Sequence, residues 1–394
     1  DERYTMTMMF VSSITLLAFF LPNAHSFLPR LTQASHHGPN KSPLVLQATS
    51  QLEQLSEMTV LSIDSGDLSV IRQYAATGYI TDATTNPLFV SQAGLSGDPV
   101  YATMVDEAVT YAVEQSQGEG NNESATVSLA IDQLSVNLGA EIASIVKGYI
   151  STEVDPRLSF DTTSSVERAR RIISMYGVKG VPRKRILIKL AATWEGILAA
   201  EILETEGITC NLTLIFSFVQ AVACAQRGAT LISPFTGRIL DWNRVNLGRA
   251  NCIEPELDEG VVCVKKMQNY FKRHGHETIC MPASWRPSRP GNDLDEIRAL
   301  SGVDRMTIPA PLLEQLLSSE EPLPRQLNPL VDCESAKGIE ALGTDGNPMD
   351  ETEFRYLLNM DGCGTDKLGE GIRAFIGETI KLEDAILAKV RAAV

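Results

Sequence analysis

The stretch "RILIKL" at residues 185–190 is an apolar run interrupted by one lysine, and "AATWEGILAAE" (191–201) follows it directly. A short run rich in Ile and Leu is typical of a buried strand, and the longer stretch after it has the composition of a helix. A strand that passes at once into a helix is the repeating unit of α/β folds. Lys189 lies inside this unit, although most lysine side chains keep their ammonium group in water.

The same strand-then-helix unit recurs along the chain. Besides 185–190, the expected strands are "TVLSID" (59–64), "YITDATT" (79–85), "VKGYIST" (146–152), "CNLTLIFS" (210–217), "ATLISP" (229–234), "ETICMP" (277–282) and "DRMTIP" (304–309). Helix-like segments lie between them at 100–117, 125–144, 163–175, 194–204, 219–226, 260–272 and 294–300. Eight such units predict a single parallel (β/α)8 TIM barrel. A doubly wound sheet is the alternative, and the near-regular spacing favours the closed barrel.

The first fifty residues have the composition of a targeting sequence. The apolar run 8–21 is about fourteen residues long, which is short for a membrane span and matches the core of a signal peptide. Residues 27–50 then contain Arg30 and Lys41 and no acidic residue, as in a transit peptide. We expect 1–50 to be a removable signal-plus-transit leader for the plastid of a secondary-plastid alga, with no stable membrane association after processing. A cytoplasmic or secretory route is the alternative.

The rest of the chain divides into three parts. We expect residues 51–317 to form the catalytic barrel, and the Pro-, Ser- and Gly-rich residues 318–350 to form an irregular connection. Residues 351–394 are predicted to be a C-terminal helical extension that packs on the barrel. Its expected apolar face consists of Leu368, Ile372, Phe375, Ile376, Ile380 and Ile386.

Composition excludes several classes of function. A net charge of −15 argues against a nucleic-acid-binding surface, which needs clustered Lys and Arg. The seven cysteines form no CxxC pair, and the chain has only five histidines, so we expect neither a metal site nor a Ser-His-Asp triad. Catalytic chemistry would then depend on lysine, carboxylate and hydroxyl groups.

Polar residues gather at the predicted strand ends. In a (β/α)8 barrel the carboxyl ends of the strands form one mouth, where active sites lie. The residues expected at this mouth are Asp64, Asp82, Thr84, Asn86, Glu153, Lys189, Asn211, Thr213, Ser233, Ser284 and Arg286.

Strand alternation places Lys189 inside the barrel. Lys189 shares a face with Leu187 and Ala191, while the opposite face, rich in Ile and Leu, suits contact with the helices. Burial disfavours a charged ammonium group, and an uncharged amine is what Schiff-base chemistry with a carbonyl requires. The alternative is a structural lysine that pairs with an interior carboxylate such as Glu153.

Five longer motifs resemble transaldolases. They are "TDATTNP" (81–87), "ISTEVDPRLSFDT" (150–162), "ILIKLAATWEGILAAE" (186–201), "CNLTLIFSFVQAVACA" (210–225) and "LISPFTGRILDW" (231–242). The resemblance covers most of the chain after residue 55. It implies a (β/α)8 barrel that uses no cofactor. The implied reaction, in the pentose phosphate pathway, transfers dihydroxyacetone from sedoheptulose 7-phosphate to glyceraldehyde 3-phosphate and yields erythrose 4-phosphate and fructose 6-phosphate.

The resemblance also implies roles for individual residues. Lys189 would form the Schiff base, Glu153 with a water placed by Thr213 would move protons, and Asp64 would deprotonate the C4 hydroxyl. The implied substrate-binding residues are Thr84, Asn86, Asn211, Ser233, the apolar wall Phe235, and Arg238, Ser284 and Arg286 for phosphate.

One segment departs from the family pattern. Where transaldolases read close to "MGASFRN" and pass directly into a helix, this chain reads "MPASWRPSRPGNDLDEI" (281–297). Ser284 and Arg286 are retained, but their loop is expected to have a different shape. Two other functions stay open: a Schiff-base aldolase that releases the three-carbon unit, and a non-catalytic barrel. The sequence also leaves open whether the protein is a monomer or a homodimer.

Overall fold

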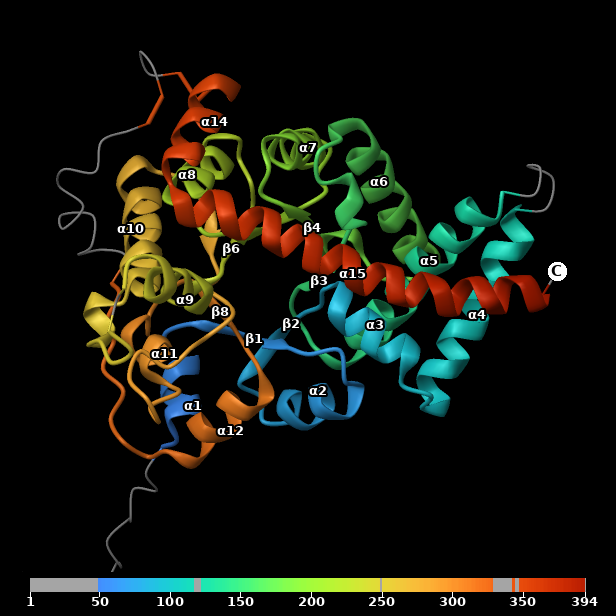
Figure 1. The fold of residues 1–394 in the computed structure, drawn as a ribbon. Helices are drawn as coiled ribbons and strands as arrows, with labels where there is room; N and C mark the ends of the chain where they lie inside the picture. Colours follow the sequence, from blue (N-terminus) through green and yellow to red (C-terminus); the bar gives the residue numbers. More distant parts are fainter. Residues whose placement is uncertain (1–48, 117–121, 249, 329–341, 344–346, 394) are drawn as a thin grey trace, which may run out of the picture. The chain divides into compact units, whose positions relative to one another are not determined.

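Eight parallel strands form the centre of the computed structural model, which describes residues 49–116, 122–248, 250–328, 342–343 and 347–393 (Figure 1). The strands are β1 (Val60–Asp64), β2 (Ile80–Thr84), β3 (Ile150–Glu153), β4 (Ile186–Ala191), β5 (Cys210–Ile215), β6 (Leu231–Pro234), β7 (Ile279–Cys280) and β8 (Arg305–Ile308). They pair in the order β7-β6-β5-β4-β3-β2-β1-β8. Thr307 N donates to Pro282 O at 3.2 Å and links β8 to the segment after β7. The predicted (β/α)8 barrel is confirmed.

Helices connect the strands and surround the barrel. They are α1 (Gln51–Ser56), α2 (Leu68–Ala75), α3 (Pro87–Leu95), α4 (Pro99–Ser116), α5 (Glu123–Ile145), α6 (Thr162–Val178), α7 (Trp194–Thr205), α8 (Phe218–Gln226), α9 (Thr236–Asn246), α10 (Glu259–His274), α11 (Asp295–Ala299), α12 (Ala310–Ser318), α14 (Glu351–Met360) and α15 (Gly362–Ala393). Helices α1, α2, α3, α9 and α12 were not predicted from the sequence.

Local capping explains where several helices begin. Asn86 Oδ1 accepts a hydrogen bond from Phe89 N at the start of α3, where Pro87 occupies the first turn. Ser217 and Gln220 form a capping box at the start of α8. These caps directly follow strand ends, so they also fix the loops at the mouth of the barrel.

The strand register determines the level of each inward side chain. Glu153 is aligned with Lys189, and Lys189 with Asn211, so these three side chains lie at one level near the carboxyl end of the barrel. Leu187, Leu231 and Met281 form a small buried apolar cluster among the inward side chains. The reactive groups therefore have apolar as well as polar neighbours inside the barrel.

Asp82 is not at the mouth, contrary to the prediction. Its carboxylate forms an ion pair with Arg305, the first residue of β8, and accepts from Tyr149 N, which precedes β3, at 3.2 Å. Both partners lie at the amino-terminal end of the barrel. Asp82 comes two residues before the end of β2 and faces inward near the bottom, where its charge is compensated by Arg305.

Helix α15 crosses the strands and packs on the mouth side of the barrel (Figure 1). Phe375 belongs to the same apolar cluster as Leu214 and Phe235 of the barrel. A side chain at Gly371 would place its Cβ 2.7 Å from Leu214 Cδ2, so glycine permits this close approach. The predicted C-terminal helical extension is present.

The prediction of the apolar face of α15 is wrong at one residue. Ile380 is 46% exposed, whereas Leu382 and Val390 are buried and contribute to the core instead. The apolar row of a straight helix drifts with its 3.6-residue period, and position 380 rotates away from the barrel.

The expected leader lies almost wholly outside the described residues, as does much of the expected connection 318–350. Within the described part of the chain, no helix combines the length and the apolar character needed to cross a bilayer.

Candidate active site

A pocket opens at the mouth of the barrel beside Lys189. Nine residues singled out from the sequence line it: Asp64, Thr84, Asn86, Lys189, Ser233, Phe235, Arg238, Ser284 and Arg286. Strands β1, β2, β4 and β6, helix α9 and the loop after β7 contribute them. The structure therefore brings together residues that lie far apart in the sequence.

Lys189 is buried and points into the barrel, as strand alternation predicted. Its exposed fraction is 3%, its Nζ donates to Thr85 O at 3.3 Å, and it lies 3.5 Å from Glu153 Oε2. This contact with Glu153 is also the one expected if Lys189 had only a structural role. Yet the amine also lines an open pocket, so a ligand can reach it.

Glu153 and Thr213 lie beside the lysine. Thr213 is aligned with Ala191, two residues after Lys189. Burial raises the pKa of Glu153 to about 7, against the opposing charge of Lys189. Among the described residues, Glu153 Oε2 and Thr213 Oγ1 are buried oxygens with no hydrogen-bond partner. Buried polar atoms are normally paired, so both oxygens suit contact with a water or a substrate hydroxyl.

Asp64 stands at the end of β1, on another side of the same pocket. Burial raises its pKa to about 6, while the positive charges of Lys189 and Arg238 oppose the rise. The carboxyl is therefore mostly ionised at neutral pH, but it is more basic than an ordinary aspartate. That is the condition expected of a general base.

A chain of hydrogen bonds orients the polar side chains at the lysine's level and below it. Ser233 Oγ donates to Asn211 Oδ1 at 2.8 Å, and Asn211 Nδ2 donates to Ser151 Oγ at 3.0 Å. Ser62 and Thr84 share a further hydrogen bond of 3.0 Å. Asn211 is a neighbour of the pocket and holds Ser233, which lines it.

Two arginines give the pocket a positive end. Arg238 on α9 lies over the Phe235 ring at 5.1 Å, and Arg286 Nε donates to Asp241 Oδ2 at 3.0 Å. Burial lowers the pKa of the Arg238 guanidinium, and the charge of Arg286 adds to this effect. A bound anion would relieve the repulsion between the two guanidinium groups, and their planar shape suits phosphate.

Seven residues of the pocket wall were not predicted from the sequence. They are Leu88, Phe89, Ala283, Trp285, Thr307, Pro309 and Phe375. Thr307 and Pro309 lie at the carboxyl end of β8. Their position at a strand end could therefore have been used to place them at the mouth. Phe375 comes from α15, far along the chain, and no local pattern marks it as part of the site.

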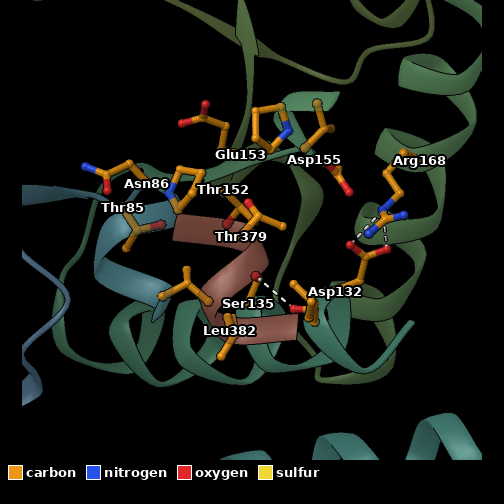
Figure 2. A pocket seen from close by; sticks show the side chains of 15 residues that line it. Thr85, Asn86, Asp132, Ser135, Thr152, Glu153, Asp155, Arg168, Thr379 and Leu382 are labelled. Carbon is orange, nitrogen blue, oxygen red and sulfur yellow. Dashed lines mark hydrogen bonds and ion pairs between the residues drawn. The ribbon is translucent and has the colours of Figure 1, made fainter. Parts of the chain in front are cut away.

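A second, smaller pocket lies between β3, α5, α6 and α15 (Figure 2). In Figure 2, Arg168 pairs with Asp132 on one side, with an Nε–Oδ2 distance of 2.6 Å, and Thr379 and Leu382 of α15 lie across from them. Arg168 and Asp132 are already paired with each other, while Glu153 and Asp155, which also line this pocket, pair with Lys189 and Arg157. The pocket therefore offers less to an ionic substrate than the mouth does. In the described part of the chain, no group of His, Cys, Asp and Glu side chains is arranged to hold a metal ion.

A (β/α)8 barrel with a buried lysine at its mouth, flanked by two carboxyl groups of raised pKa, defines a site of the Schiff-base aldolase class. The family model for Transaldolase/Fructose-6-phosphate aldolase matches residues 61–386. The chain belongs to this family.

Individual relatives agree with the family match. The chain is 46% identical over 341 residues to transaldolase 1 of Pectobacterium atrosepticum. This alignment covers 86% of the chain and 100% of the relative. The chain is also 46% identical over 347 residues to the transaldolase of Saccharomyces cerevisiae, in an alignment that covers 88% of the chain and 97% of the relative. The transaldolase of Haemophilus influenzae is 45% identical over 342 residues, or 87% of this chain and 100% of the relative.

Proposed function

We propose that the protein is a transaldolase that transfers a dihydroxyacetone unit between sugar phosphates through a Schiff base on Lys189. The observation that carries the proposal is the position of this buried amine, which lines the mouth pocket and contacts Glu153 at 3.5 Å. The similarity to transaldolases over most of the chain supports it.

The first half of the reaction forms the iminium. Uncharged Lys189 Nζ attacks the ketone carbon of fructose 6-phosphate or sedoheptulose 7-phosphate and gives a carbinolamine. Glu153, with its pKa of about 7, donates a proton to the carbinolamine hydroxyl, which leaves as water. Thr213 Oγ1, buried and without a hydrogen-bond partner among the described residues, is suited to hold that water.

The second half breaks and re-forms a carbon–carbon bond. Asp64 removes the proton of the C4 hydroxyl, the C3–C4 bond breaks, and its electrons pass into the iminium to form an enamine. The aldehyde product leaves, and the enamine attacks the aldehyde carbon of glyceraldehyde 3-phosphate or erythrose 4-phosphate. Asp64 then returns its proton, and water attacks the new iminium to release the ketose.

The other pocket residues orient the substrate. Arg238, Arg286 and Ser284 bind the phosphate, in keeping with the positive end of the pocket. The side-chain amides and hydroxyls available for the sugar hydroxyls are Thr84, Asn86, Asn211 and Ser233.

Transfer is favoured over release because apolar side chains share the pocket with the lysine. Phe235 and Phe375 both line the pocket, and an apolar cover keeps water from the enamine and the iminium. With fructose 6-phosphate alone, we expect free dihydroxyacetone to form about 100-fold more slowly than sedoheptulose 7-phosphate forms once erythrose 4-phosphate is added. Quantifying both products in parallel measures this ratio. Equal rates would identify an aldolase, and no turnover of either kind would identify a non-catalytic barrel.

We further propose that residues 1–50 direct the protein to a plastid. The Pectobacterium atrosepticum relative is matched over its full length but covers only 86% of this chain, which leaves room for an added leader. In an alga with secondary plastids, the full chain fused to a fluorescent protein is expected to coincide with chlorophyll, and a chain without residues 1–50 is expected to stay in the cytosol. Cytosolic or secreted fluorescence from the full chain would contradict the proposal.

A further inference from the structure

The loop between β7 and α11 carries Arg286 and is anchored on two sides. Thr236 N and Gly237 N, at the start of α9, donate to Ala283 O and Ser284 O, each at 3.0 Å. Trp285 Nε1 donates to Thr307 O of β8 at 2.8 Å. Ser284 has a φ of 60°, in the left-handed region that a residue with a side chain adopts only when its surroundings hold it there.

Glu296 on α11 provides a third anchor, at the arginine itself. Its Oε2 accepts a hydrogen bond from Arg286 N at 2.6 Å. The side chain is fully buried, and its Oε1 has no hydrogen-bond partner among the described residues. Burial, and next the negative charge of Asp258, raise the pKa of Glu296 well above its usual range. Burying a carboxyl group with an unpaired oxygen lowers the stability of the fold. A glutamate at this position therefore calls for a functional explanation.

We infer that Glu296 is a positioning residue of the phosphate subsite, which fixes the backbone of Arg286 so that its guanidinium faces the substrate phosphate. This inference rests on the proposed function, in which Arg286 binds that phosphate. Glu296 does not line the mouth pocket, so it acts only through the loop.

The contacts around Arg286 explain why its backbone matters. Its guanidinium is already fixed by Asp241 Oδ2 and by Trp285 O, at 3.0 and 2.8 Å. Beyond it, Arg244 Nη2 donates to Pro287 O and Ser288 O at 2.9 and 3.0 Å. Arg286 is the one residue between the anchored stretches 283–285 and 287–288, and Glu296 fixes its backbone N–H. Without it, the partly buried Arg286 N–H loses its acceptor and the loop must shift to find another.

The test compares substrates with and without phosphate. In Glu296→Leu we expect KM for fructose 6-phosphate to rise about tenfold, because a shifted Arg286 binds phosphate less well. Borohydride trapping of the enzyme with dihydroxyacetone, which has no phosphate, should change by less than about twofold. Glu296→Gln, whose side-chain carbonyl can still accept from Arg286 N, should restore KM to within about threefold of the wild-type value.

Two variants serve as references in the same assay. Glu204 accepts from Cys210 N and Thr230 N at 2.9 and 2.7 Å, at the opposite end of the barrel. Glu204→Leu removes a similar carboxyl-to-backbone anchor and should lower stability without raising KM. Arg286→Ala tests the proposed function separately, and its KM for fructose 6-phosphate should rise more than that of any Glu296 variant.

Three results would overturn the inference while the Arg286→Ala result still supports the proposed function. One is an unchanged KM in Glu296→Leu. Another is an equal loss of trapping with dihydroxyacetone, which would show a general structural role. The third applies if Glu296→Leu does not fold: a KM in Glu296→Gln that exceeds the wild-type value by more than about threefold would then contradict the proposed rescue.

Discussion

Replacing Lys189 with methionine is expected to lower the rate of dihydroxyacetone transfer by at least about four orders of magnitude. Methionine has nearly the length of lysine and tolerates a buried position, but it has no amine to attack the substrate ketone. The initial rate of erythrose 4-phosphate release from sedoheptulose 7-phosphate and glyceraldehyde 3-phosphate measures the loss. A thermal unfolding scan checks that the variant is folded.

An exposed lysine close to the same strand is the matched control. Lys184 lies two residues before β4, and Lys184→Met should keep the wild-type rate to within about twofold. A folded Lys189→Met variant that retains more than about a tenth of the wild-type rate would assign the lysine to structure alone, as the partner of Glu153.

The second large effect concerns the carbon–carbon bond. Asp64→Asn is expected to lower transfer about 100- to 10,000-fold, because an amide cannot take the proton from the C4 hydroxyl. Schiff-base formation does not need that step, so borohydride should still trap fructose 6-phosphate on the variant. Asp67→Asn, at the exposed N-cap of α2, is the control and should leave the rate unchanged. Loss of trapping in Asp64→Asn would contradict the role of Asp64 as the base in bond cleavage.

The raised pKa of Asp64 predicts the acid limb of the pH profile. The base must be ionised, and its pKa is about 6, so kcat/KM of the wild-type enzyme should fall about tenfold per pH unit below that value. An ordinary aspartate would keep its charge to about pH 4. A profile that stays flat down to pH 5 would mean that Asp64 is not the titrating base.

The fold was predictable because each strand and the helix after it form one local unit. The apolar run around Lys189 is readable in sequence and places that side chain inside the barrel, whereas the caps at Asn86 and Ser217 emerged only from the structure. The position of a side chain along the barrel axis was harder to predict from the sequence, because it depends on the register between neighbouring strands. Asp82 shows this: it was expected at the mouth, but it pairs with Arg305 at the bottom of the barrel.

Most of the candidate site followed from strand ends and from family motifs, and the rest depends on long-range packing. Phe375 reaches the pocket only because α15 crosses the mouth, with Gly371 allowing the approach to Leu214. Glu296 contacts the site through a single backbone hydrogen bond to Arg286. No periodicity or motif marks such contacts before the chain is folded.

The proposed mechanism depends on a covalent bond between Lys189 and the substrate carbonyl. Incubating the full chain with fructose 6-phosphate and borohydride, followed by proteolysis and mass spectrometry, detects that bond. We expect a reduced three-carbon or six-carbon adduct on the peptide that contains Lys189, and none in Lys189→Met. An adduct on a different lysine, or sustained transfer activity with no trapped adduct, would contradict it.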